Sequence, residues 1–303
     1  MRKTRLTDTI TYLEPDSMKS FQACAGLIVE DAGQKLLIDT NMGPGETAAM
    51  LEEERPDRAV ISHYHLDHAT WGATALEHSE AELFVPEREA AYLTDLAFFL
   101  EHTAGPFGLA EPWREFSVNV TGYREIDRFT PYTETDRFNV GGTTIEVVGT
   151  PGHSPAHMAF RFPEEGILFT GDMGVDAFGP WYGWRDCDLK QLVASTLRLR
   201  GLSVNLMVTS HGGIIRSGFS RVWEENLLRL LERERAIYEK LERGMARTDI
   251  VEEGIFFRSK ADVSEPLRSF LYMWDGAMFD HHRELIAEGG LLSFFPELSS
   301  LLS

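Results

Sequence analysis

The sequence predicts an α+β fold in which packed sheets are combined with helices and followed by a helical C-terminal extension. Three observations support this prediction. Short strands joined by turns open the chain, apolar strands alternate with helices as far as residue 211, and a long helical stripe of apolar residues begins near residue 222. With 303 residues, the chain can form one large domain with an elaboration, or two small domains.

The first part of the chain is predicted to form an antiparallel meander of strands at 9–13, 22–29 and 35–38, with a turn at 31–34. Alternating helices and strands are then expected, in the order helix 46–53, strand 58–62, helix 72–78, strand 81–86 and helix 87–100. Residues 101–124 are rich in Gly, Pro and aromatic residues without clear periodicity, so we expect a long loop that forms part of a pocket wall.

The later part of the chain is predicted to return to strands and then to end in helices. Strands are expected at 143–148, 166–171 and 205–210. Helices are expected at 222–243, 248–253, 265–279 and 281–288. We therefore divide the chain into a catalytic domain at 1–217, with an insertion around 101–124, and a helical extension at 218–303 that lies near the active site.

The composition is that of an ordinary globular protein, with 43% hydrophobic and 25% charged residues. The formal net charge of −19 repels polyanions, so we expect a small-molecule substrate and no nucleic-acid partner, and we leave homo-oligomerisation open. We expect no membrane span and no secretory signal, because no apolar stretch follows the basic start of the chain. The two cysteines, Cys24 and Cys187, fit a reducing compartment, and we expect a cytoplasmic protein.

One heptapeptide stands out, because residues 62–68 hold three of the chain's 10 histidines together with an aspartate. It reads Ser-His-Tyr-His-Leu-Asp-His and follows the apolar strand at 58–62. Imidazole and carboxylate groups are good ligands for transition metals. We interpret the heptapeptide as half of a metal site rather than as a cluster of solvated histidines.

The spacing within the heptapeptide favours two metal ions. Side chains at i and i+2 of an extended segment point the same way, so His63 and His65 can bind one ion together. Asp67 and His68 follow after the chain has begun to turn towards a helix near Thr70. Their side chains therefore face a different point in space from those of His63 and His65. Two adjacent metal ions would fit this arrangement.

Three later strands deliver further ligand-type residues. The strand at 143–148 leads into residues 149–157, which read Gly-Thr-Pro-Gly-His-Ser-Pro-Ala-His and contain His153 and His157. The strands at 166–171 and 205–210 end at Asp172 and His211. Each candidate ligand thus sits at or just after a strand end, so packed sheets could bring them all to one edge.

These segments together resemble the metallo-β-lactamase superfamily. The heptapeptide resembles its His-x-His-x-Asp-His signature, residues 150–157 its Thr-Pro-Gly-His segment with Ala156 where glycine is usual, and residues 170–172 its Thr-Gly-Asp turn. The resemblance covers about 9–213 and implies an αββα sandwich. It also implies that Asp39 braces the metal loop without being a ligand, and that His157 has at most a supporting role.

The resemblance implies a complete set of metal ligands. One metal ion would be held by His63, His65 and His153, and the other by Asp67, His68 and His211, with the two oxygens of Asp172 bridging them. A histidine-rich, sulfur-free set suits two zinc ions, although iron and manganese accept the same ligands. The solitary His78 and His102 are expected to be surface or core histidines.

The expected reaction is hydrolysis of an ester, thioester or lactone of a small acyl compound. The family implies a metal-bridged hydroxide as nucleophile, because a metal ion lowers the pKa of bound water to about 7. Asp67 is the expected catalytic residue, orienting the hydroxide and shuttling a proton. Phe107, Trp113, Trp181, Tyr182 and Trp184 are candidates for an apolar substrate wall, and core packing explains them equally well.

Several alternatives to this function stay open. The related persulfide dioxygenases bind a single iron through positions that match His63, His153 and Asp172, so a mononuclear-iron sulfur dioxygenase is a second hypothesis. A non-catalytic ligand-binding protein on the same fold is a third. The C-terminal helices resemble those of glyoxalase II and lactonase-like relatives, but glyoxalase II itself fits poorly, because Arg185 is the only basic residue found in the segment after Asp172. Asp280-His281-His282 is expected to lie at a surface helix N-terminus.

Overall fold

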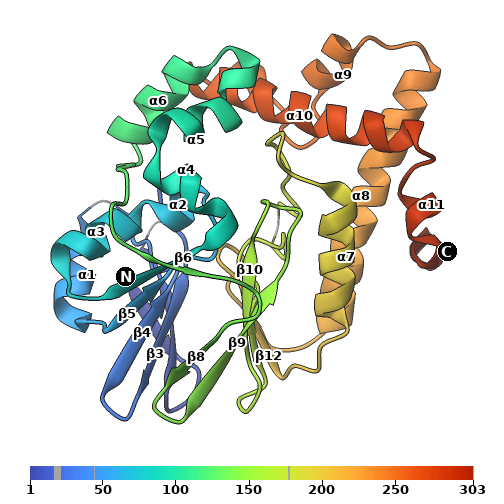
Figure 1. Cartoon of the computed structure of the whole chain (residues 1–303). Coiled ribbons are helices and arrows are strands. Elements are labelled where there is room, and N and C mark those ends of the chain that lie inside the picture. The colour runs from blue at the N-terminus through green and yellow to red at the C-terminus, as the bar shows by residue number, and fades with distance from the viewer. Residues whose placement is uncertain (17–21, 44, 177, 303) are drawn as a thin grey trace.

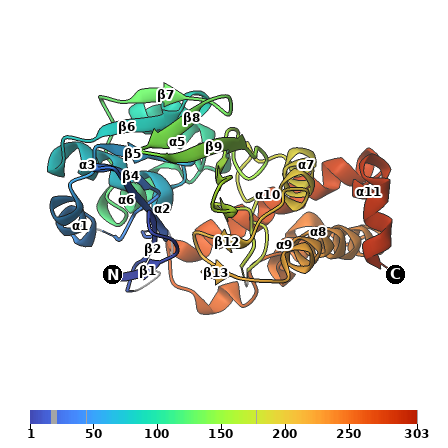
Figure 2. The same ribbon diagram turned by 90° about the horizontal axis from the view of Figure 1, so that it is seen from below.

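The computed structural model describes residues 1–16, 22–43, 45–176 and 178–302. These residues form two β-sheets that pack face to face, with helices on the outer faces and a group of helices at the C-terminal end (Figures 1 and 2). The predicted α+β sandwich with a helical C-terminal region is confirmed.

The first sheet has seven strands in the order in which they occur along the chain: β1 (Arg2–Arg5), β2 (Ile10–Glu14), β3 (Gly26–Asp31), β4 (Gln34–Ile38), β5 (Arg58–Val60), β6 (Glu82–Pro86) and β7 (Thr130–Tyr132). Strands β1 to β4 pair antiparallel, which confirms the predicted meander, and β4 to β7 pair parallel. Parallel pairing needs long crossovers, and helices fill these connections.

The second sheet has six strands: β8 (Arg137–Val140), β9 (Thr143–Gly149), β10 (Met158–Phe162), β11 (Ile167–Phe169), β12 (Leu206–Val208) and β13 (Ile214–Ile215). Strands β8 to β11 form an antiparallel ladder, while β11 and β12 are parallel. The crossover between β11 and β12 contains helix α7 (Leu189–Arg200), which covers the outer face of this sheet (Figure 1).

The core between the sheets follows from the alternation of side chains along each strand. Leu27 and Val29 of β3 pack between the sheets against residues such as Phe160 of β10, whereas Ile28 belongs to the core beneath the outer helices. That outer core includes helices α1 (Glu46–Glu54) and α3 (Trp71–His78). Because both cores lie on the faces of the sheets, the strand ends remain available for polar side chains.

Three predicted elements differ from the structure. The helix expected at 87–100 is divided into a 3-10 turn η1 (Glu87–Glu89) and helices α4 (Ala90–Thr94) and α5 (Leu96–His102), because Asp95 is extended and its side chain accepts a hydrogen bond from Phe98 N at 3.0 Å as the N-cap of α5. The long loop expected at 101–124 contains the 3-10 turn η2 (Gly105–Phe107) and helix α6 (Ala110–Asn119). The two helices expected at 265–279 and 281–288 are one helix, α10 (Leu267–Ala287).

The C-terminal helices lie against the sandwich. Helix α8 (Phe219–Glu242) follows β13, α9 (Arg247–Glu253) and the 3-10 turn η3 (Lys260–Asp262) precede α10, and the chain ends with α11 (Leu291–Phe294) and η4 (Pro296–Leu302). Helix α10 crosses one end of the molecule and reaches α6 (Figure 1), where Phe270 packs edge-to-face on Trp113 with ring centroids 5.0 Å apart. Helices far apart in sequence therefore meet beside one end of the sandwich.

Cys24 and Cys187 are both buried and free. No helix in the part of the chain that the structure describes is long and apolar enough to cross a bilayer.

A buried ion pair anchors the C-terminal helices. Lys260 Nζ lies 2.7 Å from Asp275 Oδ2, and these residues are only 2% and 0% exposed. Asp275 also accepts hydrogen bonds from the backbone N–H groups of Phe256 and Phe257, at 2.9 and 3.3 Å. A carboxylate on α10 therefore fixes the position of the segment that joins α9 to η3.

Substitution of Asp275 should destabilise the protein strongly. Asp275→Asn leaves the Lys260 ammonium group buried without its anion, and we expect the free energy of unfolding to fall by about 3–5 kcal/mol in urea denaturation. Asp262→Asn is the matched control, because Asp262 is exposed in the neighbouring turn. Equal effects of the two substitutions would contradict a structural role for the ion pair.

Candidate metal centre and substrate cavity

The heptapeptide loop is held in place by a buried carboxylate at the end of β4. Asp39 Oδ1 accepts a hydrogen bond from Ser62 N at 2.8 Å, and Asp39 Oδ2 lies 2.9 Å from His68 Nδ1. Asp39 and His68 are fully buried. Because the Nδ1 atom of His68 is occupied by Asp39, its Nε2 atom is the one presented to the site.

The first group of candidate ligands consists of His63, His65 and His153, with one ring nitrogen from each within 4.8 Å of the others. His153 Nδ1 lies 3.0 Å from the Trp181 carbonyl oxygen. A carbonyl can only accept, so Nδ1 carries the proton and Nε2 presents a lone pair 3.3 Å from His63 Nε2. Burial, together with the neighbouring histidines, lowers the pKa of His63 and His65 well below the usual range. Neutral imidazoles are the form that binds metals.

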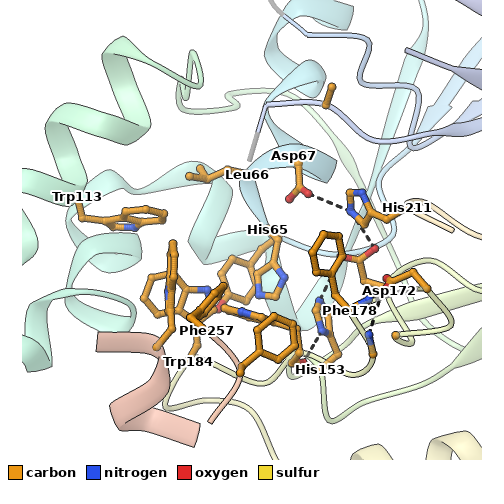
Figure 3. Close-up of a pocket in the computed structure, with 18 of the residues that line it drawn as sticks. His65, Leu66, Asp67, Trp113, His153, Asp172, Phe178, Trp184, His211 and Phe257 are labelled. Carbon is orange, nitrogen blue, oxygen red and sulfur yellow. Dashed lines mark hydrogen bonds and ion pairs between the residues drawn. The ribbon is translucent and has the colours of Figure 1, made fainter. Parts of the chain in front are cut away.

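The second group consists of Asp67, His68, Asp172 and His211, which also place one ligand atom each within 4.8 Å of the others. His211 Nε2 lies 3.1 Å from Asp67 Oδ2 and 3.3 Å from Asp172 Oδ1. Figure 3 shows these three side chains pointing toward one another. Burial raises the pKa of Asp172, but His211 and His68 outweigh this effect and hold it well below the usual range, so the side chain is a carboxylate.

Asp172 lies between the two groups. Its Oδ1 atom is 3.1 Å from His68 Nε2 in the second group, and its Oδ2 atom is 3.8 Å from His153 Nε2 in the first. The structure therefore brings together all seven residues that the sequence singled out as ligands: His63, His65, Asp67, His68, His153, Asp172 and His211.

His157 supports Asp172 and does not join either group. Its Nε2 atom accepts a hydrogen bond from Asp172 N at 3.0 Å, and its Nδ1 atom lies 2.7 Å from Thr150 Oγ1. Both ring nitrogens are thus engaged. Gly171, which has φ of 55°, is required here because a Cβ atom would lie 2.6 Å from His157 Nε2.

The residues present fit bound metal ions. His65 Nε2, His68 Nε2 and Asp172 Oδ1 are buried and make no hydrogen bond, although the last two atoms face each other. Buried polar atoms without partners are rare in native structures, since each costs about 1–3 kcal/mol. Cations bound among these two carboxylates and five histidines would give the unpaired atoms a partner.

A cavity of about 390 Å³ opens beside both groups. Its wall is mainly aromatic, and no Lys or Arg lies among the described residues that line it. The aromatic lining residues are Tyr64, Phe99, Trp113, Phe178, Trp181, Trp184, Phe256, Phe257 and Trp274. In Figure 3 the candidate ligands Asp67, His211 and Asp172 lie at one end of the cavity and Trp113 at the other. The cavity suits an apolar, uncharged group close to the ligands.

The structure separates the aromatic residues that the sequence singled out. Trp113, Trp181 and Trp184 line the cavity, whereas Phe107 lies on a separate polar cavity together with Arg185 and His281. Tyr182 is buried, and its hydroxyl lies 2.8 Å from His282 Nε2.

The other histidines lie outside the two groups. His281 Nε2 lies 2.7 Å from the Trp184 carbonyl oxygen, and both His281 and His282 lie within α10 rather than at a helix N-terminus, because α10 is continuous. His78 pairs with Glu52 at 3.1 Å, and His102 Nδ1 lies 2.8 Å from the Phe98 carbonyl oxygen.

Sequence reasoning missed Phe99, Phe257 and Trp274, which come from α5, the segment before η3, and α10. Each looks like an ordinary apolar residue of a helical or irregular segment. Only the tertiary packing of these segments brings them to the cavity, so no local signal could have identified them.

The fold is shared with solved structures. A metallo-beta-lactamase family protein from Thermus thermophilus superposes with a TM-score of 0.70 at 21% identity, over 94% of this chain and 95% of that one. A beta-lactamase domain protein from Burkholderia ambifaria gives a TM-score of 0.71 at 17% identity, over 95% of this chain and 89% of that one. At these identities the likeness shows the fold alone, including the C-terminal region.

Sequence comparisons assign the family. An atrochrysone carboxyl ACP thioesterase of Aspergillus fumigatus is 31% identical over 258 residues, which span 78% of this chain and 70% of that protein. The lactamase-like protein nscB of Trichophyton verrucosum is 25% identical over 215 residues, which span 71% of this chain and 72% of that protein. The match to nscB of Trichophyton equinum spans half of that protein. The family model of the metallo-beta-lactamase superfamily matches residues 21–211, well over half of the chain. The chain therefore belongs to the metallo-beta-lactamase superfamily.

Proposed function

We propose that this protein is a dinuclear metal-dependent hydrolase that cleaves an ester, thioester or lactone of an apolar, uncharged acyl group. The observation that carries this proposal is the position of Asp172, whose two oxygens face two separate groups of ligand-type side chains at one end of an aromatic cavity. The relative named as a thioesterase makes thioesters the first class to test.

The metal ions would be held by two sets of side chains that share Asp172. The first set is His63, His65 and His153, and the second is Asp67, His68 and His211. Bound at these positions, the metals would polarise the substrate carbonyl and lower the pKa of water to about 7. The ligand types favour zinc, with iron and manganese as the other candidates.

Asp67 is the proposed catalytic residue. It lines the cavity and also contacts His211, so its carboxylate belongs to the second ligand group and borders the cavity. From this position it can orient the attacking water, accept a proton from it and return that proton to the leaving group. The cavity wall would hold the acyl group and exclude bulk water from the reacting carbonyl.

Loss of a single ligand should remove both metal and activity. For His65→Ala and Asp172→Ala we expect less metal per chain by elemental analysis, and a fall in kcat/KM of at least about 10³-fold, because several kcal/mol of transition-state stabilisation are lost. His102→Ala is the control, since His102 is exposed and outside both groups. Full activity in either ligand variant would contradict a dinuclear mechanism. A single iron per chain with oxygen uptake and no hydrolysis would favour a dioxygenase instead.

The aromatic wall should determine the preference for apolar substrates. Phe257→Ala removes apolar surface from the cavity, and we expect KM for a neutral aryl thioester to rise by about 10- to 100-fold, because burial of such a side chain is worth about 1.5–3 kcal/mol. We expect kcat to change much less, since Phe257 is not among the candidate ligands. Phe294→Ala, which removes an exposed phenylalanine of α11, is the control. A Phe257→Ala enzyme with unchanged KM for all apolar substrates would show that the substrate lies elsewhere.

A further inference from the structure

A buried carboxylate lies behind the first ligand group. Glu89 is fully buried, at the end of the 3-10 turn η1 that follows β6. Its Oε2 atom accepts a hydrogen bond from Tyr64 N at 2.7 Å, and its Oε1 atom accepts from Ser154 Oγ and Ala156 N, both at 2.6 Å. These three partners are neutral donors. Burying a carboxylate among neutral groups is costly, and burial raises the pKa of Glu89 to about 7.

The partners of Glu89 come from the two loops that carry the three histidines of the first group. Tyr64 lies between His63 and His65, and Ser154 directly follows His153. The first loop follows β5 of the seven-stranded sheet, whereas the second joins β9 to β10 of the six-stranded sheet. One side chain therefore connects the two sheets at the position where these histidines meet.

The second ligand group has different supports. Asp39 contacts His68 and the backbone of Ser62, and His157 contacts the backbone of Asp172. Glu89, by contrast, makes none of its hydrogen bonds to a residue of the second group. Groups that orient metal ligands typically change metal affinity by about 10- to 100-fold when they are removed.

We propose that Glu89 is a positioning residue for the His63, His65 and His153 group and sets the affinity of that half of the site for its metal ion. This inference rests on the dinuclear site proposed above. Glu89 does not contact the substrate cavity or the ligand atoms, so it acts through the backbones of the two loops.

The test is zinc binding by the Glu89→Gln variant in two backgrounds. Glutamine is similar in size and can still accept from Ser154 and Ala156, but its amide N–H groups would face Tyr64 N–H, where an acceptor is needed. In the His211→Ala background, which keeps the first group intact, we expect Glu89→Gln to weaken zinc binding by about 10- to 100-fold in calorimetric titration of the metal-free protein. In the His65→Ala background, which keeps the second group intact, we expect no change.

The comparison of the two backgrounds decides between a positioning role and a general structural role. The proposal would be overturned if Glu89→Gln weakened zinc binding equally in both backgrounds, or if it caused no weakening in the His211→Ala background. Glu87→Gln is the matched control, because Glu87 is exposed in the same turn. If Glu89→Gln does not fold, Ser154→Ala removes a single donor to Glu89, and it should give a smaller weakening confined to the same background. The absence of that weakening would also overturn the proposal.

The proposed function and this inference fail in different ways. If the wild-type protein binds no metal, the dinuclear site itself is wrong. If the wild-type protein binds two ions and the Glu89→Gln variant binds both with unchanged affinity, only the role of Glu89 is wrong.

Discussion

The structure depends on the convergence of seven polar side chains at one edge of a β-sandwich. Several of their atoms are buried without hydrogen-bond partners, notably His65 Nε2. A chain folded without cations would have to tolerate these atoms at about 1–3 kcal/mol each. The fold tolerates such a cluster because the surrounding contacts hold it in place: Asp39, His157 and Glu89 each fix a loop through backbone or ring hydrogen bonds. Much of the buried polar structure at this edge serves to orient the ligand groups.

The two parts of the molecule have different chemical character. The sandwich contributes the ligand-type residues: five lie in loops that follow strands, and Asp67 and His68 lie in the short helix α2 (Leu66–Ala69) after β5. The segment at 96–119 and the helices after residue 218 contribute apolar surface, including Phe99, Trp113 and Trp274. The overall charge of −19 and a cavity wall without cations among its described residues act in the same direction, since both disfavour an anionic substrate. The candidate metal ligands and much of the aromatic wall of the cavity therefore come from different segments.

The sequence predicted the ligand set better than the cavity, for a physical reason. The ligands lie in short local patterns at strand ends, and local patterns can be interpreted without knowledge of tertiary structure. Phe257 lines the cavity from a segment that Asp275 holds against α10, through a contact between residues that no periodicity connects. Glu89 was hidden in the same way, because it lies in a stretch that resembles an ordinary charged helix. The break at Asp95 was also not predicted. There the side chain accepts a hydrogen bond from the backbone as an N-cap, and this bond competes with continuation of the preceding helix.

Trp181 connects the cavity to the ligand groups. Its carbonyl oxygen accepts the hydrogen bond from His153 Nδ1, and its indole ring lines the cavity, 5.2 Å from the ring of His65 in an edge-to-face arrangement. The loop that carries Trp181 is in turn held by Arg233 of α8, which donates to the Pro180 carbonyl oxygen at 2.6 Å and lies over the ring of Phe256. Trp181 thus contacts both the cavity and a candidate ligand histidine, and Arg233 of the helical extension holds the loop that carries it.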